Sequence, residues 1–377
     1  MAELEPSSRD TETVPPVSPT LSVSVVICAH TEERWSALVA AVASVRQQLR
    51  PAHEIIVVID HNPGLLEQAR SWFSDVTDVT VIANGQLQGL SGARNTGVAS
   101  SNGDVVAFLD DDAVAAPDWL AQLIKGYAAA NVMAVGGSIK PDWHTRRPGW
   151  FPEEFDWVVG CAYLGMPTVA TEVRNLIGCN MSIRREIVEQ VGGFHSGIGR
   201  FGADTSGCEE TELFIRMRQQ LPAATVLYRP DAQVFHAVPS ARSTWRYFRA
   251  RCAGEGYSKA LISQLVGSRD ALSNERSYTM RTLPAGMIRG VIASLRNRNT
   301  DGLGQSGAIL SGLLITSWAY LYRRAVMVMA RHSMSLRATV ESVSAESASE
   351  QGKPSQQEGS EAHGLVPGEH GSGWRHG

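Results

Sequence analysis

The sequence predicts an α/β fold with a mostly parallel β-sheet. Three observations support this class: short runs of branched apolar residues recur along the first third of the chain, segments with apolar residues at helical spacing separate them, and polar or acidic residues follow each run. Strands that alternate with helices pair in parallel through right-handed crossovers. Buried parallel strands are apolar along their whole length, as these runs are.

The individual elements follow from these patterns in chain order. In the first part, the expected strands are 23–27, 54–59, 80–83 and 105–109, and the expected helices are 35–50, 65–73 and 91–100. Farther along, the pattern predicts a strand and then a helix within 175–193, a helix from Glu209, and short strands at 226–228 and 232–235. Ligands collect at the carboxyl ends of strands in open α/β sheets, so the residues after these strands are the first candidates for a site.

The composition is that of an ordinary globular protein with tails. Of the 377 residues, 43% are hydrophobic and 19% are charged, which is enough for one large core or two smaller ones. The formal charge of -4 argues against a general nucleic-acid binder, because such a protein has a basic excess over a whole domain. The five cysteines include no Cys-x-x-Cys pair, so neither a disulfide framework nor a zinc site is indicated. A reducing, cytoplasmic setting fits best.

The chain is expected to divide into four parts. They are a leader at 1–20, a folded α/β domain at 21–265 (halves 21–115 and 116–265), a helical segment at 266–337 and a tail at 338–377. The leader lacks the apolar core of a secretory signal, and the tail is rich in Ser, Glu, Gln, Gly and His. Both are expected to be disordered, because they have little apolar surface to bury.

Three consecutive carboxylates, Asp110, Asp111 and Asp112, follow the fourth predicted strand. Adjacent acids repel one another unless a cation or a set of hydrogen-bond donors neutralises them. Side chains alternate along an extended segment, so Asp110 and Asp112 point the same way and can share a hard divalent cation such as Mg²⁺ or Mn²⁺. The competing interpretation is that Asp111 and Asp112 cap the next helix, for which Pro117 and Asp118 already supply a start signal.

The first turn, residues 28–33, contains no glycine. A dinucleotide-binding fold needs a Gly-x-Gly-x-x-Gly turn so that the backbone can approach a pyrophosphate, and this turn offers polar and acidic side chains instead. At the end of the next strand, Asp60 has acceptor oxygens suited to a base imide or to ribose hydroxyls. With equal weight, Asp60 could belong to an Asx turn before Pro63.

Five sequence blocks together resemble family 2 glycosyltransferases with the GT-A fold. The blocks are 24–32, 54–60, 92–97, 103–112 and 207–213. Each block alone is a weak signal, but all five occur in the order and spacing of the family. The similarity covers about residues 21–259. It implies a Rossmann-like GT-A domain, with a mostly parallel sheet and flanking helices, that transfers a sugar from a nucleotide-sugar donor.

The resemblance also implies the donor and metal sites. The implied donor-binding residues are Ala29, Glu32, Asp60, Arg94, Asp110 and Asp111. Asp112 is the implied metal ligand of the Asp-x-Asp motif, with Asp110 beside it, and His236 is carried over as a third ligand of Mg²⁺ or Mn²⁺. A lone histidine is as often structural. Among relatives, uridine diphosphate is the commonest nucleotide of the donor.

Sugar transfer requires a base, because the attacking acceptor hydroxyl must lose a proton. Glu209 and Glu210 lie at the start of a predicted helix, and this helix end faces the cleft in the family. By position Glu210 is the base, although many relatives have Asp there. Glu209 is the competing assignment, and the remaining alternative is that both acids only cap the helix.

Aromatic residues interrupt the family pattern between residues 142 and 166. Their faces stack on sugar C–H surfaces and on lipid chains, but they also make good core. The hypothesis is an acceptor loop that runs from Trp150 to Trp157. The segment 175–193, which includes Asn180, resembles the family's floor beneath the donor and acceptor sugars.

The C-terminal helical segment is a candidate for membrane association. Between residues 281 and 331 seven arginines face a single acid, Asp301, and residues 302–322 have no charge. This stretch is near the roughly 17 to 25 residues of a spanning helix, but its Gly, Ser and Thr residues make it weakly apolar. We expect peripheral attachment to the cytoplasmic, inner face of a membrane. A spanning helix and a core or dimer helix pair are the alternatives.

The sequence therefore predicts a metal-dependent, inverting glycosyltransferase with a lipid-linked or growing-glycan acceptor, such as a dolichyl- or polyprenyl-phosphate-linked sugar. One alternative is a phosphatase of the haloacid dehalogenase type, because Asp110-x-Asp112 after an apolar strand also fits its nucleophile motif. That motif belongs on the first strand, whereas here it follows the fourth. The other alternative is a catalytically silent nucleotide-sugar binder or membrane scaffold, whose mark would be the loss of these acids.

Overall fold

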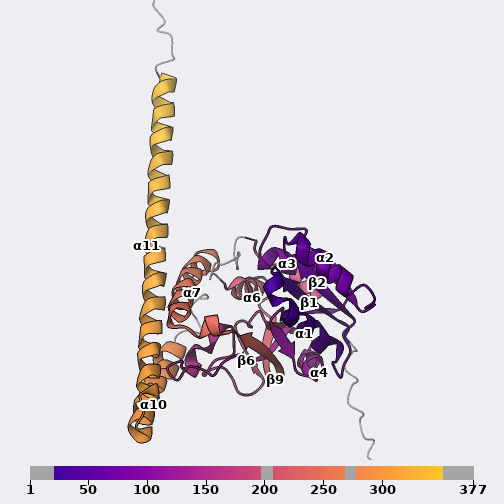
Figure 1. Cartoon of the computed structure of the whole chain (residues 1–377). Coiled ribbons are helices and arrows are strands. Elements are labelled where there is room, and N and C mark those ends of the chain that lie inside the picture. The colour runs from indigo at the N-terminus through magenta and orange to yellow at the C-terminus, as the bar shows by residue number, and fades with distance from the viewer. Residues whose placement is uncertain (1–20, 197–206, 268–276, 351–377) are drawn as a thin grey trace, which may run out of the picture. The chain divides into compact units, whose positions relative to one another are not determined.

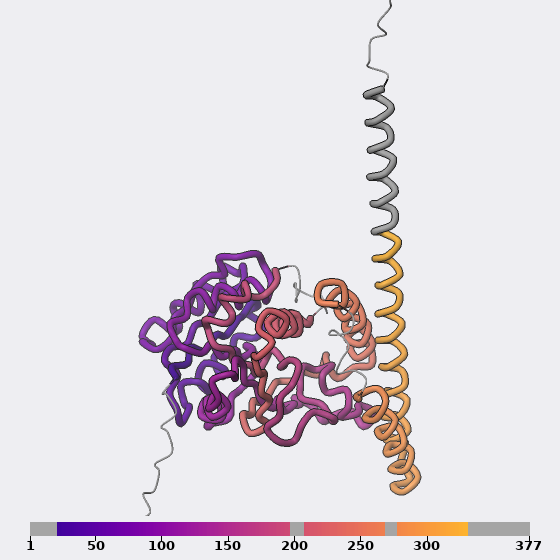
Figure 2. The backbone as a smooth tube through the Cα atoms, turned by 180° about the vertical axis from the view of Figure 1, so that it is seen from behind, coloured from indigo at the N-terminus to yellow at the C-terminus, as the bar shows by residue number. Residues whose placement is uncertain are grey.

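The computed structural model of the chain describes residues 21–196, 207–267 and 277–350, with side chains up to Ala330 (Figure 1). Within this part, nine strands form one sheet, and α-helices flank it (Figures 1 and 2). The predicted leader and residues 351–377 of the predicted tail lie outside the described residues.

The element bounds agree closely with the sequence pattern in the first part of the chain. The strands are β1 (Val23–Ala29), β2 (Glu54–Ile59), β3 (Val79–Ala83), β4 (Val105–Asp110), β5 (Ala113–Ala115), β6 (Val132–Trp143), β7 (Thr171–Glu172), β8 (Asn180–Arg184) and β9 (Thr225–Val238). The α-helices are α1 (Trp35–Arg46), α2 (Pro63–Trp72), α3 (Leu90–Ala99), α4 (Trp119–Lys125), α5 (Arg185–Gln190), α6 (Glu209–Gln220), α7 (Trp245–Leu265), α10 (Leu283–Asn297) and α11 (Asp301–Glu350).

The sheet has the strand order β3-β2-β1-β4-β8-β6-β9-β5, and β7 pairs with β9. β3, β2, β1 and β4 pair in parallel, β8 runs antiparallel to both β4 and β6, and β9 is parallel to β6. β5 and β7 are antiparallel to β9. Only β8, β5 and β7 thus run against the other strands, so the predicted α/β class with a mostly parallel sheet is confirmed.

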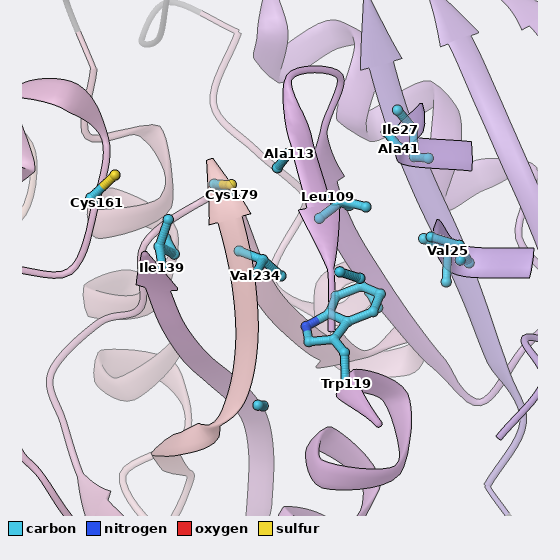
Figure 3. Close-up of a cluster of buried hydrophobic side chains, with 14 of the residues drawn as sticks. Val25, Ile27, Ala41, Leu109, Ala113, Trp119, Ile139, Cys161, Cys179 and Val234 are labelled. Atoms are coloured by element: carbon cyan, nitrogen blue, oxygen red, sulfur yellow. The ribbon is translucent and has the colours of Figure 1, made fainter. Parts of the chain in front are cut away.

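The alternation of side chains along each strand divides the core into two layers. Val25 of β1 packs in the layer that contains Leu38 of α1 and Trp119 of α4. Its neighbour Val26 packs in the other layer, together with Phe214 of α6. Each of these five side chains is at most 1% exposed. Figure 3 shows part of the first layer, where the Trp119 ring lies against the sheet. Helices on both faces therefore fix the strand ends that form the site.

The strand β9 differs from its prediction. The segments 226–228 and 232–235, predicted as two short strands, belong to one continuous strand. Arg229 and Gln233 pair with successive residues of β6, so the residues between them bulge out of the ladder. The apolar pattern breaks at this bulge, which is why the sequence indicated two strands.

The helix after the acidic triplet does not use the triplet as a cap. α4 begins at Trp119 with Asp118 at the N-cap position, and β5 lies between the triplet and this helix. The interpretation of Asp111 and Asp112 as helix caps is therefore wrong.

The C-terminal part of the described chain is helical. α11 extends to Glu350, beyond residue 337, where the helical segment was expected to end. The chain divides after Ala325 into two compact units, of which the first contains the sheet. Among the helices of the described residues, including the one that contains 302–322, none combines the length and the apolar character that a membrane crossing requires.

Candidate active site

The acidic end of β4 lies against the beginning of β8. Because these strands are antiparallel, Cys179, which directly precedes β8, is placed beside Asp110. His236 reaches the same point from β9, which pairs with β5. Ligand atoms of Asp110, Cys179 and His236 lie within 4.8 Å of one another. With Asp112, which contacts His236, these residues form what we call the cation cluster.

Asp112 has three nitrogen partners. His236 Nε2 lies 3.1 Å from Asp112 Oδ1, and Arg34 and Arg242 each place a guanidinium nitrogen 3.2 Å from Asp112 Oδ2. Burial alone would raise the pKa of Asp112, but these partners together hold it well below its usual range. The Asp112 side chain is therefore ionised at neutral pH.

Asp111 has a different environment. Arg34 Nη1 donates to Asp111 Oδ1 at 2.9 Å, and Asp111 Oδ2 has no hydrogen-bond partner among the described residues. Burial and the neighbouring charge of Asp112 raise the pKa of Asp111 to about 7. Of these two adjacent carboxyl groups, Asp112 therefore holds the firm negative charge.

The donor set of the cation cluster fits a divalent cation. Two carboxylates and an imidazole offer the oxygen and nitrogen ligands that Mg²⁺ and Mn²⁺ accept. His236 is 3% exposed and Asp112 8%, so packing holds both in place. Cys179 adds a thiol whose pKa burial raises well above its usual value, so it faces the cluster as a neutral group.

A cavity of about 990 Å³, the smaller cavity, lies at the carboxyl ends of β1, β2 and β4. Four of the predicted donor-binding residues line it, namely Ala29, Asp60, Asp110 and Asp111, and Asp112, Arg34 and Arg242 line it as well. Acids and arginines thus share one wall, which suits a ligand that combines phosphates with a cation.

Asp60 is held by its neighbours in the smaller cavity. Asn84 Nδ2 donates to Asp60 Oδ1 at 2.6 Å, and the backbone N–H of Gly89 donates to Asp60 Oδ2 at 2.9 Å. Glu32, the fifth predicted donor residue of this region, is not among the lining residues. Its Oε2 instead accepts from Asn62 Nδ2 at 2.9 Å, beside the start of α2. Asp60 therefore faces the cavity and fixes the segment 84–89, rather than a turn before Pro63.

A second cavity of about 1380 Å³, the larger cavity, adjoins the smaller one. Leu90, Asp110 and Arg251 line both cavities. Glu209 and Glu210, at the N-terminus of α6, line the larger cavity. The two base candidates and the cation cluster are therefore open to one connected space.

Glu209 forms a buried ion pair with Arg94. Arg94 Nη1 donates to Glu209 Oε1 at 2.7 Å, and Arg94 Nη2 lies 3.7 Å from Asp110 Oδ1. The Arg94 guanidinium also lies over the rings of Phe108 and Phe194, 5.8 and 5.5 Å from their centroids. The side chains of Arg94 and Glu209 are only 3% and 5% exposed. Oε1 of Glu209 thus holds Arg94, whereas its Oε2 is buried without a hydrogen-bond partner among the described residues.

Glu210 has the environment of a base. It is half-buried and lines the larger cavity. Burial and then the charge of Glu209 raise the pKa of Glu210 to about 8, with Glu255 of α7 adding to the rise and Arg94 opposing it. A carboxyl group with a pKa in this range can take up and release a proton near neutral pH.

Asn180, a predicted acceptor residue, is not placed at either cavity. Its side chain is 1% exposed and fully engaged in the sheet. Its Nδ2 donates to the carbonyls of Ser138 and Ala232, and its Oδ1 accepts from Trp119 Nε1 at 2.8 Å. Asn180 therefore has a structural role, in which it joins β8 to β6, β9 and α4 beneath the site.

The aromatic stretch contributes mostly core. Trp150 packs against the rings of Trp245 and Phe248, at centroid distances of 5.0 and 5.7 Å, and does not line either cavity. Trp157 does line the larger cavity, where its Nε1 donates to the Tyr278 hydroxyl at 3.0 Å. Of the three predicted acceptor residues, the structure brings only Trp157 to the site.

Comparison with known proteins identifies the family. The profile described as "Glycosyl transferase family 2" matches residues 24–192. The glucosyl-dolichyl phosphate glucuronosyltransferase of Haloferax volcanii is 36% identical over 307 residues, which cover 80% of this chain and 96% of that protein. The chain belongs to glycosyltransferase family 2.

Other relatives extend the comparison of this family 2 enzyme. The succinoglycan biosynthesis protein ExoM of Rhizobium meliloti is 25% identical over 304 residues, 78% of this chain and 94% of that protein. Among solved structures, the mannosyltransferase PcManGT of Pyrobaculum calidifontis, in complex with GDP-Man and Mn²⁺, matches with a TM-score of 0.49 and 17% identity, over 79% of this chain and 87% of that chain. GalNAc-T7 with UDP, GalNAc and Mn²⁺ matches with a TM-score of 0.46 and 18% identity, over 69% and 56%.

Membership of family 2 decides between the enzyme classes that the sequence left open. The chain is a glycosyltransferase of the GT-A class that uses a nucleotide-sugar donor in glycan biosynthesis, as predicted. The haloacid dehalogenase alternative is wrong, and Asp110 accordingly ends β4 rather than the first strand of the sheet. The alternative of a catalytically silent nucleotide-sugar binder or membrane scaffold is wrong as well, because the chain is a glycosyltransferase.

The structure of this family 2 enzyme also brings in residues that the sequence did not single out. Arg34 contacts Asp111 and Asp112, and its position just after the polar first turn was a usable signal. Arg251 lines both cavities, and its place in the arginine-rich stretch 242–251 was a usable signal. Cys179 had no such signal, because its place beside the cluster depends on the reversed direction of β8.

Proposed function

We propose that this family 2 enzyme is a metal-dependent, inverting glycosyltransferase that moves a sugar from a nucleoside-diphosphate donor, a UDP-sugar in the first instance, to a lipid-linked acceptor sugar. The main support is that Asp110, Cys179 and His236 of the cation cluster line the larger cavity together with Glu210, while Asp110 also lines the smaller cavity. A donor with its diphosphate at Asp110 has its nucleoside in the smaller cavity and its sugar in the larger one.

Asp112, Asp110 and His236 are the residues that would hold Mg²⁺ or Mn²⁺. When bound, this cation neutralises the charge that develops on the departing diphosphate. Arg251, at the junction of the cavities, supplies a guanidinium for the phosphate oxygens. Arg34 and Arg242 keep Asp112 ionised, so the cluster is charged before the donor arrives.

The smaller cavity is assigned to the nucleoside. Ala29 at the end of β1 leaves room there, and Asp60 offers the base or the ribose the lone pairs that Asn84, Gly89 and His61 do not use. Glu32 is assigned an indirect part, because its carboxylate positions Asn62 at the rim.

Glu210 is assigned the proton transfer. The acceptor hydroxyl oxygen bonds to the anomeric carbon while the bond from that carbon to the phosphate oxygen breaks, and the hydroxyl proton passes to the Glu210 carboxylate. The electron pair of the broken bond leaves with the diphosphate. Attack from the face opposite the leaving group inverts the anomeric configuration, as in single-displacement glycoside hydrolysis. The charge of Glu209, held by Arg94, raises the pKa of Glu210 and so makes it a stronger base.

A lipid-linked acceptor is supported by two observations. The Haloferax volcanii relative is named for transfer to glucosyl-dolichyl phosphate. In this chain, the larger cavity is walled by aromatic and apolar residues on the side formed by α10 and α11 and the segments around them, including Trp157, Tyr163, Tyr278 and Leu313. Such a wall suits an acceptor that combines a sugar with a hydrocarbon chain.

The test is a transfer assay on the full chain with Mn²⁺, a panel of UDP- and GDP-sugars, and glucosyl-polyprenyl phosphate as acceptor. We expect transfer that stops on addition of EDTA, a product of inverted anomeric configuration by NMR, and loss of transfer in Asp112→Asn and Glu210→Gln. Asp75→Asn, which removes an exposed carboxylate outside both cavities, is the matched control and should remain active. A product of retained configuration, or transfer that EDTA does not affect, would contradict the proposal.

A further inference from the structure

α10 presents a row of exposed apolar side chains. Ile288, Val291, Ile292 and Leu295 are 61, 40, 57 and 77% exposed. Their spacing of three and four residues places them on one face of the helix. The residues buried in α10 are Leu283, Gly286, Gly290 and Ser294, which lie on the opposite face. The exposed row is therefore a second apolar face on a helix whose core-facing side is already occupied.

α11 presents a matching row. Leu303, Leu310, Leu314, Trp318 and Leu321 are 54, 48, 60, 72 and 61% exposed and recur at intervals of three, four and seven residues. The other side of α11 packs on the α/β domain, where Thr316 Oγ1 donates to the carbonyl of Cys252 at 3.1 Å and Gly312 lies against Phe155. The row on α11 thus also points away from the core.

The two rows are fixed relative to each other, because α10 and the first part of α11 lie side by side (Figures 1 and 2). Ser306 Oγ donates to the carbonyl of Met287 at 2.8 Å, and the backbone N–H of Leu303 donates to Ser294 Oγ at 2.8 Å. Gly290 and Gly302 meet backbone to backbone, so a side chain at either would collide with the other helix. We call the combined surface of the nine exposed residues the α10–α11 face.

Positive charge surrounds the α10–α11 face. Residues 277–325 contain six arginines and one acid, Asp301. Arg296 and Arg298 are exposed at the end of α10, and Arg324, three residues after Leu321, is half-exposed at the other end of the α11 row, where its Nη1 donates to the Tyr320 hydroxyl at 3.0 Å. An apolar face with arginines at its borders fits the interface of an anionic bilayer, in which apolar side chains enter the acyl boundary and the arginines meet the phosphates. A second copy of the chain would instead bring like charges together.

The α10–α11 face also continues into the larger cavity. Leu321 belongs to the exposed row and at the same time lines that cavity, together with Leu313, Thr316, Ser317 and Tyr320 of the same helix. We propose that the α10–α11 face lies in the surface of an anionic membrane, and that the larger cavity opens beside it to take a lipid-linked acceptor directly from that membrane. The second half of this inference rests on the proposed function, whereas the first half stands on the surface alone.

The test of the first half is co-sedimentation of the full chain with vesicles of phosphatidylcholine, with and without phosphatidylglycerol. We expect binding to the anionic vesicles only, and binding at least about tenfold weaker for Leu295→Glu, which puts a charge into the apolar row. Leu49→Glu is the matched control, because Leu49 and Leu295 are both 77% exposed. Arg296→Gln is expected to weaken binding about fivefold, as one arginine at an anionic surface does, while Arg70→Gln on α2 should not.

Vesicle binding that Leu295→Glu leaves unchanged would overturn the inference. So would a change from dimer to monomer in Leu295→Glu, by light scattering, with vesicle binding unaltered, because a second copy would then cover the face. The second half is tested by transfer to an acceptor embedded in the vesicles, which Leu295→Glu should slow about tenfold, against a short-chain, water-soluble acceptor, which it should not. Donor hydrolysis without vesicles reports on the proposed function separately, so a failure there is distinguishable from a failure to bind membrane.

Discussion

Replacing Glu210 by Gln removes the proposed base and little else. The amide keeps the size of the carboxyl group but cannot take the proton of the acceptor hydroxyl. A positioned general base contributes about 10²- to 10⁴-fold to the rate, so kcat is expected to fall by a factor in this range. The KM for the donor should change little, because the cation cluster and the smaller cavity are untouched. Steady-state transfer kinetics measure both constants.

The pH profile of the wild-type enzyme follows from the raised pKa of Glu210, which is about 8. The base must be ionised to act, so kcat should rise with pH, reach half its maximum near pH 8 and level off above about pH 9. Between pH 7 and pH 9 the ionised fraction grows from about one tenth to about nine tenths, which predicts a rise of about ninefold in kcat. Glu209, Arg94 and Glu255 are the charged groups that set this pKa. The residual rate of Glu210→Gln should lack the rise.

Glu209→Gln provides the comparison that can refute the assignment. Removing one partner of a buried ion pair costs about 3 to 5 kcal/mol, and the lower end applies because Arg94 keeps Asp110 at 3.7 Å. A loss of about 3 kcal/mol lowers the melting temperature by about 6 to 12 °C in calorimetry. Without the charge of Glu209, the pKa of Glu210 falls and the pH profile shifts to lower pH. If Glu209→Gln stayed folded but lost all transfer while Glu210→Gln remained active, Glu209 would be the base.

Three further changes probe the donor side. Asp112→Asn is expected to weaken Mn²⁺ binding at least about tenfold, since a charged ligand is lost. The signal of free Mn²⁺ in electron paramagnetic resonance measures this binding, and unchanged binding would exclude Asp112 as a ligand. Asp60→Asn is expected to raise the Kd of the nucleoside diphosphate in calorimetry, because an amide accepts hydrogen bonds at only one of its two ends, so the bond from Asn84 or the one from Gly89 is lost and the side chain no longer holds its place; an unaltered Kd would assign Asp60 to the segment 84–89 alone. Arg251→Gln is expected to raise the KM for the donor about tenfold through the loss of a charge-assisted hydrogen bond. Arg249→Gln, which changes an exposed residue of the same helix, should leave this KM unchanged. Equal effects of the two variants would show that Arg251 is not part of the donor site.

The parallel half of the sheet could be predicted from the sequence, because each of its strands is a continuous apolar run. The segments 54–59 and 105–109 match β2 and β4 to within one residue, and Glu209 begins α6 as expected. These elements depend on local patterns of apolar residues and on helix start signals. The end of β4 at Asp110 follows from the same local pattern, but Asp111 and Asp112 form the turn between β4 and β5, so strand alternation does not place Asp112.

The rest of the site depends on contacts between distant segments. Asn180 has its amide satisfied by Ser138 and Ala232, 42 and 52 residues away, so its burial could not be read from its neighbours. Trp150 packs on rings of α7, which no local pattern reveals. Likewise, the proposal of Glu210 over Glu209 as the base draws on the position of Arg94, which pairs with Glu209. The roles of two adjacent residues of the same type, such as Glu209 and Glu210, can be distinguished only from the side chains that the fold packs against each of them.

The reversal of β8 relative to β4 has a consequence for how such enzymes diversify. On the side assigned to the nucleotide, the functional groups follow the ends of β1, β2 and β4, where the chain leaves the sheet. On the other side, the segment that ends at Cys179 lies beside these groups just before the chain enters β8. Under the proposed function, insertions, deletions or exchanges in the residues upstream of β8 would therefore change the acceptor site while the exits of β1, β2 and β4 stay as they are. An unchanged donor site could in this way serve different acceptors.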